Sequence, residues 1–297
     1  MTFIALALII LSAGLHAAWN FLSKSGSPSI GYFFLTNLAA TVVTLPFTVW
    51  GPVDYTALPM RFWIIALCSI LCEWAYVTAL ANGYKRAEIS FFYPMSRSLP
   101  VVFTFVLCSL LGIGKTLSTV AIAGMILVTL GCLILPIQKF SNIRLKDYFN
   151  STMPFVLLGA FGTTGYTIFD STSCNYLYTL EKSKILTALG YFGVIEAGIL
   201  FGTMIVLLFS AKERKNVKNL WKSPSPYMSG IFSVGAYGLV LIAMGLVTNV
   251  SFIQAFRQLS LPIGVALGIF ILKEKVTLPK LIGVAMLLTG LILAAVK

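Results

Sequence analysis

The feature that most constrains this chain is a series of apolar runs, each about 20 residues long, that recur along the whole sequence. A run of that length forms a helix that can cross the roughly 30 Å hydrocarbon layer of a bilayer. Charged residues make up only 10% of the 297 residues, too few to cover the surface of a water-soluble domain. The sequence therefore predicts an all-α polytopic membrane protein.

We predict ten transmembrane helices, at 2–22, 30–50, 61–82, 88–111, 117–137, 152–173, 185–210, 227–248, 250–272 and 277–296. The first run lacks a small-residue cleavage site after it and is interpreted as a retained helix. The net charge of +12 comes from basic residues in short loops, where they orient helices and meet anionic lipid headgroups. We therefore expect membrane lipids as partners and no nucleic acid.

The two halves of the chain resemble each other, and a hydrophilic linker at 139–151 separates residues 1–138 from residues 152–297. Matching residues recur in order at offsets of 159 to 161: Ala75–Tyr76 and Ala236–Tyr237, Arg97 and Arg257, Gly124 and Gly283, Gly131 and Gly290. Because each half has five spans, the second must enter the membrane from the opposite side. This predicts two five-helix inverted repeats around a central cavity, an architecture that many secondary transporters use. The glycines are interpreted as stripes for close helix packing.

Polar residues at helical spacing give five of the spans a polar face. In chain order they are Ser12, His16, Trp19, Asn20 and Ser23; Glu73 and Tyr76; Ser90, Tyr93 and Arg97; Thr163, Tyr166, Thr167 and Asp170; and Gln254, Arg257 and Gln258. A single such residue can be interhelical glue worth only about 0.6 kcal/mol. Five stripes over both halves instead favour helices that surround a wet cavity.

Arg97 and Arg257 are both expected near the middle of the membrane, where a charge costs at least ~2.5–3.5 kcal/mol on insertion scales. A guanidinium group is suited to bidentate capture of a carboxylate or phosphate. The alternative is a structural ion pair with Glu73 or Asp170. We favour substrate contact for Arg257, and for Arg97 both interpretations stay open.

Glu73 is the first candidate for proton coupling, because burial favours the neutral form of a carboxyl group. A carboxylate paired with an internal arginine is the alternative. His16, the single histidine, and Asp170 are further coupling candidates, although Asp170 lies near the end of its predicted span and His16 can be a hydrogen-bonded wall residue. Glu196 has few polar neighbours and is interpreted as a neutral structural acid.

The full candidate substrate-binding set is Trp19, Asn20, Glu73, Tyr76, Tyr93, Arg97, Tyr166, Tyr237, Gln254 and Arg257. No cofactor or metal is expected, because the five cysteines lie in or beside apolar runs with no histidine close in sequence. An enzyme is disfavoured as well, because the chain has one histidine, scattered acids and no HExxH or glycine-rich phosphate motif.

Three segments match a known family: LHAAWN and a lysine at 15–24, GYTIFD at 165–170, and the stretch from AYGLVLIAMG at 236 through SFIQAFRQLSLPIGVALGIFILKEKVTLPKLIGV. Over essentially its full length the chain resembles the EamA-type transporters of the drug/metabolite transporter superfamily. The resemblance implies two five-helix inverted repeats, an acid before the last helix (Glu274), and a ligand between spans one, three, four, six, eight and nine. It also implies export of small metabolites, amino acids or drugs, by proton linkage or exchange.

The sequence thus predicts a secondary transporter, and specifically an exporter, of a small organic anion or zwitterion such as an amino acid. A multidrug or lipid-linked sugar exporter of the same fold is the alternative. We expect the protein in the bacterial inner membrane, as a monomer or homodimer, with a small-molecule substrate and protons as further partners. The loops after odd-numbered spans carry 14 Lys and Arg residues, whereas the loops after even-numbered spans and the C-terminal tail together carry 5. The positive-inside rule therefore predicts that both termini lie outside the cytoplasm. The family usually has its termini inside.

Overall fold

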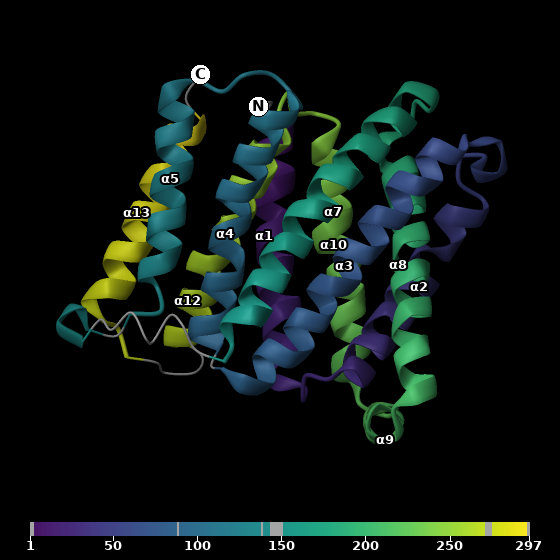
Figure 1. The fold of residues 1–297 in the computed structure, drawn as a ribbon, viewed down its shortest axis with the longest axis horizontal. Coiled ribbons are helices and arrows are strands. Elements are labelled where there is room, and N and C mark those ends of the chain that lie inside the picture. Colours follow the sequence, from purple (N-terminus) through teal and green to yellow (C-terminus); the bar gives the residue numbers. More distant parts are fainter. Residues whose placement is uncertain (1–2, 88, 138, 143–150, 271–274, 296–297) are drawn as a thin grey trace.

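The computed structural model describes residues 3–87, 89–137, 139–142, 151–270 and 275–295, which form helices joined by turns and contain no strand (Figure 1). Most of the predicted linker 139–151 lies outside these residues. The predicted loop acid Glu274 and the side chain of Ser90 also lie outside what the structure describes.

Helical residues coincide with every predicted span. The first half contains α1 (Phe3–Ser25), α2 (Ile30–Val49), the 3₁₀ helix η1 (Tyr55–Ala57), α3 (Met60–Arg86), α4 (Ile89–Leu111), α5 (Thr119–Ile134) and η2 (Phe140–Asn142). The second half contains α7 (Met153–Leu180), α8 (Lys184–Phe209), α9 (Ala211–Leu220), α10 (Pro224–Met244), α11 (Val250–Phe256), η3 (Arg257–Leu259), α12 (Ser260–Phe270) and α13 (Leu278–Ala295). The polar helix α9 falls where the sequence predicted only a hydrophilic link.

Seven described helices are long and apolar enough to cross a membrane, namely α1, α2, α3, α4, α8, α10 and α13. By length and composition the chain is therefore a multi-pass membrane protein. The apolar helix α5 is shorter, with 16 residues. Helix α7 has 28 residues, but its polar side chains lower its hydropathy.

Short polar side chains begin several of these helices. The Ser29 Oγ accepts the N–H of Tyr32 at the start of α2, and the Ser118 Oγ accepts that of Ala121 at the start of α5. Such N-caps satisfy backbone donors that have no partner inside the helix.

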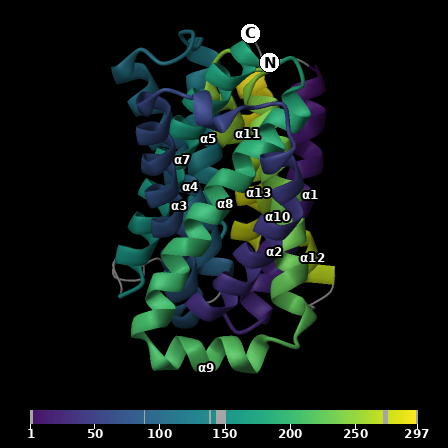
Figure 2. The same cartoon turned by 90° about the vertical axis from the view of Figure 1, so that its right-hand side faces the viewer.

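The main packing pairs between the two halves have counterparts when the halves are exchanged. Helix α3 packs against α7 just as α1 packs against α10, and α4 against α7 as α12 against α1. The pairs α2–α8 and α5–α13 each join one half to the other. Both termini lie at one end of the molecule, and α9 crosses the opposite end (Figure 2).

Glycine stripes bring α5 and α13 into backbone contact. A Cβ atom at Gly131 would lie 2.7 Å from the carbonyl oxygen of Gly283, and one at Gly124 would lie 2.6 Å from that of Gly290. Any larger residue would push the helices apart. The prediction that these glycines serve close helix packing is confirmed.

The predicted span 250–272 is helical throughout residues 250–270, but the 3₁₀ turn η3 separates α11 from α12 and breaks the α-helical hydrogen-bond pattern. Pro262 has no N–H to donate to the carbonyl of Gln258, one turn earlier. The Ser260 N–H donates to the carbonyls of Arg257 and Gln258, and the Ser260 Oγ donates to the Arg257 carbonyl at 3.0 Å. The break falls at Arg257 and presents this residue to the centre of the molecule.

Candidate functional site: a central polar cavity

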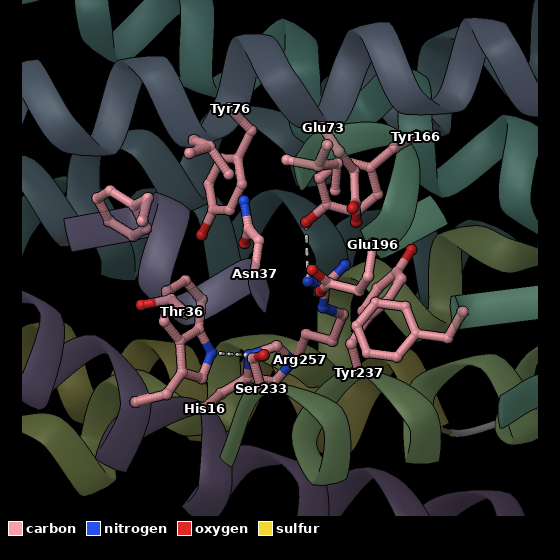
Figure 3. Close-up of a pocket in the computed structure, with 15 residues that line it drawn as sticks. His16, Thr36, Asn37, Glu73, Tyr76, Tyr166, Glu196, Ser233, Tyr237 and Arg257 are labelled. Carbon is pink, nitrogen blue, oxygen red and sulfur yellow. Dashed lines mark hydrogen bonds between the residues drawn. The ribbon is translucent and has the colours of Figure 1, made fainter. Parts of the chain in front are cut away.

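A cavity lies at the centre of the molecule, between helices of both halves (Figure 3). About 60 Å³ of it is open to the centres of water molecules, whereas one water needs roughly 10–15 Å³. Glu73, Tyr166 and Glu196 line it from the middle of α3, α7 and α8. The cavity therefore lies midway between the two ends of these helices.

Seven of the predicted residues line the cavity: His16, Trp19, Glu73, Tyr76, Tyr166, Tyr237 and Arg257. The other predicted residues lie behind this lining: Asn20, Tyr93, Arg97, Asp170 and Gln254. Figure 3 shows Glu73 and Tyr166 approaching from one side and His16 and Ser233 from the other.

Arg257 is the cation of the cavity, and it is buried. Its Nη2 donates to the hydroxyl of Tyr166 at 2.9 Å, and its guanidinium lies over the rings of Tyr166 and Tyr237, 5.6 and 5.2 Å from their centroids. Its Nε has no hydrogen-bond partner among the described residues. The predicted alternative, an ion pair of Arg257 with Glu73 or Asp170, is not formed in the described part of the chain.

Two carboxyl groups line the same cavity, from Glu73 and Glu196. The Oε2 of Glu196 is buried and has no hydrogen-bond partner within the described ranges. The sequence interpretation of Glu196 as a packed structural acid missed this placement. Its position in the middle of an apolar span was the available signal, because an ionisable group at that depth is expensive.

The place of Asp170 near the end of its predicted span suggested that it reaches the membrane interface. In the structure it does not. Helix α7 continues to Leu180 and buries the Asp170 carboxylate. It accepts hydrogen bonds from the hydroxyls of Ser69, of Tyr191 at 2.7 Å and of Tyr237 at 2.5 Å. These donors come from α3, α8 and α10, so Asp170 joins four helices beside the cavity.

His16 contributes an unused ring nitrogen. The Nε1 of Trp19 donates to its Nδ1 at 2.9 Å, so that nitrogen carries no proton. The buried Nε2 has no partner among the described residues. Asn20 braces this arrangement from behind, donating to the His16 carbonyl at 2.7 Å and accepting from the Tyr84 hydroxyl at 2.9 Å.

Arg97 lies in a second layer, against the break at η3. Its Nη2 is 3.4 Å from both the Arg257 carbonyl and the Ser260 Oγ, and the Tyr93 hydroxyl is 3.0 Å from the same Oγ. Gln254 also lies behind the lining, where its Oε1 accepts from Thr167 at 3.3 Å.

Helices α2 and α8 line the cavity although the resemblance did not point to them, and none of the described side chains of α4 lines it. Residues missed by the sequence analysis include Thr36, Asn37 and Ser233. Asn37, Thr41, Thr44 and Thr48 repeat at spacings of four, three and four, so a polar face of this span was the available signal.

A second cavity, of about 290 Å³, lies between the start of α3 and the end of α7. It is lined by Pro59, Arg61, Phe62, Ile65, Thr172, Ser173 and Tyr176. Although larger, it holds one charged residue and none of the predicted site residues. The central cavity, with its cation and two carboxyls, is therefore the candidate functional site.

At the α9 end, Glu213 ties the two halves together. Its Oε2 accepts the N–H of Gly31 at 2.9 Å, and its Oε1 lies 3.6 Å from the Lys85 Nζ. Burial acts to raise the pKa of this carboxyl, but hydrogen bonds from Asn216 and Gly31, together with the Lys85 charge, hold the pKa below its ordinary value. The contact joins α9 to the ends of α2 and α3.

No family model matches the sequence, and no curated protein matches it. A solved crystal structure, described only as that of a protein, covers 99% of this chain and 96% of its own chain with a TM-score of 0.69. Its sequence is 16% identical. The likeness shows a shared fold over the whole chain. Fold and site together define an all-α, multi-pass membrane protein with a polar cavity at its centre.

Proposed function

We propose that the protein is a secondary transporter of small organic anions or zwitterions, with ten transmembrane helices arranged as two inverted five-helix repeats. Support for the repeats comes from the main helix pairs between the halves, which have counterparts when the halves are exchanged. Support also comes from Lys24 and Lys184, 160 residues apart, whose Nζ atoms donate to the carbonyls of Tyr84 at 2.6 Å and Gly245 at 2.8 Å. Inverted repeats suit alternating access to a site between them.

The observation that carries this proposal is the environment of Arg257. A buried guanidinium group with an unpartnered Nε faces a cavity between the two halves, and no carboxylate among the described residues lies within 4 Å of it. A buried charge of this kind is expensive to keep without a partner. A carboxylate or phosphate of a substrate supplies that partner and accepts two parallel hydrogen bonds.

The rest of the cavity fits a small substrate. Aromatic side chains of Trp19, Tyr76 and Tyr166 form apolar walls, and the space for water centres is about 60 Å³. Drug-sized sites are typically ~300–1,000 Å³, so the cavity favours an amino acid or another small metabolite. A substrate with an amino group would place it toward Glu73 and Glu196.

Proton coupling belongs to this proposal. Glu73 lines the cavity beside Arg257, so it can exchange a proton as the substrate enters or leaves. The unused Nε2 of His16 is a second exchange position. Asp170 already accepts three hydroxyl hydrogen bonds, and its coupling role would require that this network open.

One observation favours a second candidate, an exporter of lipophilic cations. Among the residues that the structure describes, two carboxyl groups and one arginine line the cavity. A bound organic cation could pair with Glu73 and Glu196 while its rings stack on the aromatic walls. An exporter of lipid-linked sugars stays a variant of the same fold.

The proposed setting is the bacterial inner membrane. The α9 end carries Lys85, Arg86 and the basic residues of α9, so the positive-inside rule places this end in the cytoplasm and both termini outside.

A thermal-shift screen of the detergent-purified protein tests the function. A ligand that binds only the folded state raises the melting temperature once its concentration passes its dissociation constant. We expect stabilisation by one or more amino acids or organic acids, lost in Arg257→Ala. The matched control is Arg61→Ala, which removes an exposed arginine that lines the second cavity and not the central one.

Stabilisation by lipophilic cations alone, unchanged in Arg257→Ala and lost in Glu73→Gln, would instead support the cation exporter. Stabilisation by no compound in the screen would contradict both.

A further inference from the structure

Arg97 and Arg257 hold matching positions in the two halves. They begin the similar triplets Arg97–Leu99 and Arg257–Leu259, which are 160 residues apart. Each lies on the segment that precedes the last helix of its half. In the structure, however, their surroundings differ.

Arg257 stands at a helix break and lines the cavity, whereas Arg97 lies within the continuous helix α4 and behind the lining. The side chain of Arg97 is fully buried. Two of its nitrogens, Nε and Nη1, have no hydrogen-bond partner among the described residues. Its two hydrogen bonds are both long, at 3.4 Å, and its guanidinium lies 5.6 Å from the centroid of the Tyr93 ring. Most of the hydrogen-bonding capacity of Arg97 is therefore unused in this structure.

Helix α4 also carries what a break at Arg97 would need. Pro94 and Pro100 lie inside the helix on either side of Arg97. Each proline removes one backbone hydrogen bond and crowds the preceding turn, so the helix is weakest around Arg97. In the second half, Pro262 accompanies the break that has already formed at Arg257.

We propose that Arg97 is a second anion-binding residue, and that Arg97 and Arg257 exchange places in the central cavity as the protein alternates between two opposite-facing states. This inference rests on the proposed transport function and names the group that meets the substrate in the second state.

The physical argument follows from the inverted repeat. When two inverted repeats exchange conformations, the opposite-facing state results. In that state α4 breaks between its prolines and presents the Arg97 guanidinium to the cavity, while the segment around Arg257 straightens and withdraws. An anionic substrate therefore meets a guanidinium from either face of the membrane. Substrates without an anionic group would gain from neither arginine.

Sided labelling of the wild-type protein with 4-hydroxyphenylglyoxal, a water-soluble arginine reagent, tests the exchange. The reagent is applied to right-side-out and to inside-out membrane vesicles, and peptide mass spectrometry measures modification of each arginine. Exposed Arg61, at the end that holds the termini, and exposed Arg86 and Arg214, at the α9 end, report which face the reagent has reached.

We expect Arg97 and Arg257 to be labelled from opposite faces. If both were labelled from the same face, or if Arg97 stayed unlabelled from both faces, the exchange would be overturned and Arg97 would be a brace for η3.

Two proline variants sharpen the test without removing either arginine. Pro100→Ala should strengthen α4, lower Arg97 labelling by roughly tenfold and raise Arg257 labelling, because a proline strongly disfavours a helix interior. Pro262→Ala should do the reverse. Parallel changes of both arginines in either variant would contradict the proposal.

Labelling requires no transported compound, so its outcome is separate from that of the substrate screen. A screen without any stabilising anion would remove the proposed function even if the arginines alternate. A successful screen with both arginines labelled from one face would remove only the exchange.

Discussion

The α5–α13 pair and the central cavity are built on opposite principles. In the pair, glycines bring two backbones into contact, and a Cβ atom at Gly131 or Gly283 would collide with the partner helix. Around the cavity, buried polar atoms such as the Arg257 Nε and the Glu196 Oε2 lack partners among the described residues. The α5–α13 pair is closely packed, whereas buried polar atoms around the cavity lack hydrogen-bond partners among the described residues.

This difference in packing suits the α5–α13 pair to a structural role and the central cavity to ligand binding. Close backbone packing stabilises helix association in a membrane, where burial of apolar surface gives little driving force. Unpartnered buried charge does the opposite, because each such group costs free energy until a ligand or proton satisfies it. Substitutions in the pair should therefore lower stability and spare ligand specificity, and substitutions in the cavity should do the reverse.

The largest expected effect is on transport by Arg257→Ala. Removing a buried charged contact costs about 2–5 kcal/mol, so transport of the anionic substrate should fall by roughly thirtyfold or more. The melting temperature of the ligand-free protein should change little or rise, because an unpaired buried charge is lost. Transport assays in proteoliposomes and thermal melts measure the two quantities, with Arg61→Ala as control.

The next effect is on stability, in Gly131→Leu. The new side chain would meet the backbone of Gly283 and Leu287, and overpacking of this kind costs about 1–3 kcal/mol. We expect a lower melting temperature in detergent, with unchanged affinity in the protein that stays folded. Gly14→Ala is the matched control, because a Cβ there meets nothing within 4 Å. Equal melting temperatures for both variants would contradict the claim that close packing of α5 against α13 stabilises the protein.

Glu73→Gln should have a smaller and more specific effect. The amide cannot exchange a proton, so substrate accumulation should no longer follow an imposed pH gradient, while binding of organic acids that lack an amino group is kept. Fluorescent proton flux and substrate flux in the same proteoliposomes measure this. Glu196→Gln is the comparison, and transport that still follows the gradient in Glu73→Gln but not in Glu196→Gln would move the coupling role to Glu196.

The smallest effect is expected at the α9 end. The pKa of Glu213 is lowered in the folded protein, so its contribution to stability is present above the ordinary carboxyl pKa and is lost as the pH falls through the lowered value. Glu213→Gln should lower stability at neutral pH by less than about 1 kcal/mol and by nothing in acid. Thermal melts across pH measure it, and Glu181→Gln is a control acid at the other end. A loss that persisted in acid would contradict this account.

The membrane-spanning helices could be predicted from the sequence because a bilayer imposes both length and hydropathy on a helix. The glycine stripes were predictable for a similar reason, since only small residues permit backbone contact between helices. The break at Arg257 was missed because its cause, Pro262, follows the break by more than one turn and also fits a merely kinked helix.

The cavity was predictable where polar residues repeat at helical spacing, as for His16, Glu73 and Tyr166. It was not predictable where one polar residue stands alone, as Glu196 does, because depth in a bilayer is not periodic. The separation of Arg97 from Arg257 could not be predicted either. Two residues in matching sequence positions have the same pattern, and only the packing around α4 and η3 distinguishes them.

The most direct test of the central claim is solute counterflow in proteoliposomes loaded with unlabelled amino acids and organic acids, with each radiolabelled compound added outside. We predict transient accumulation of at least one compound by the wild-type protein and none by Arg257→Ala. Absence of counterflow for every compound in the wild type, or the same rate in Arg257→Ala, would contradict transport through the Arg257 cavity.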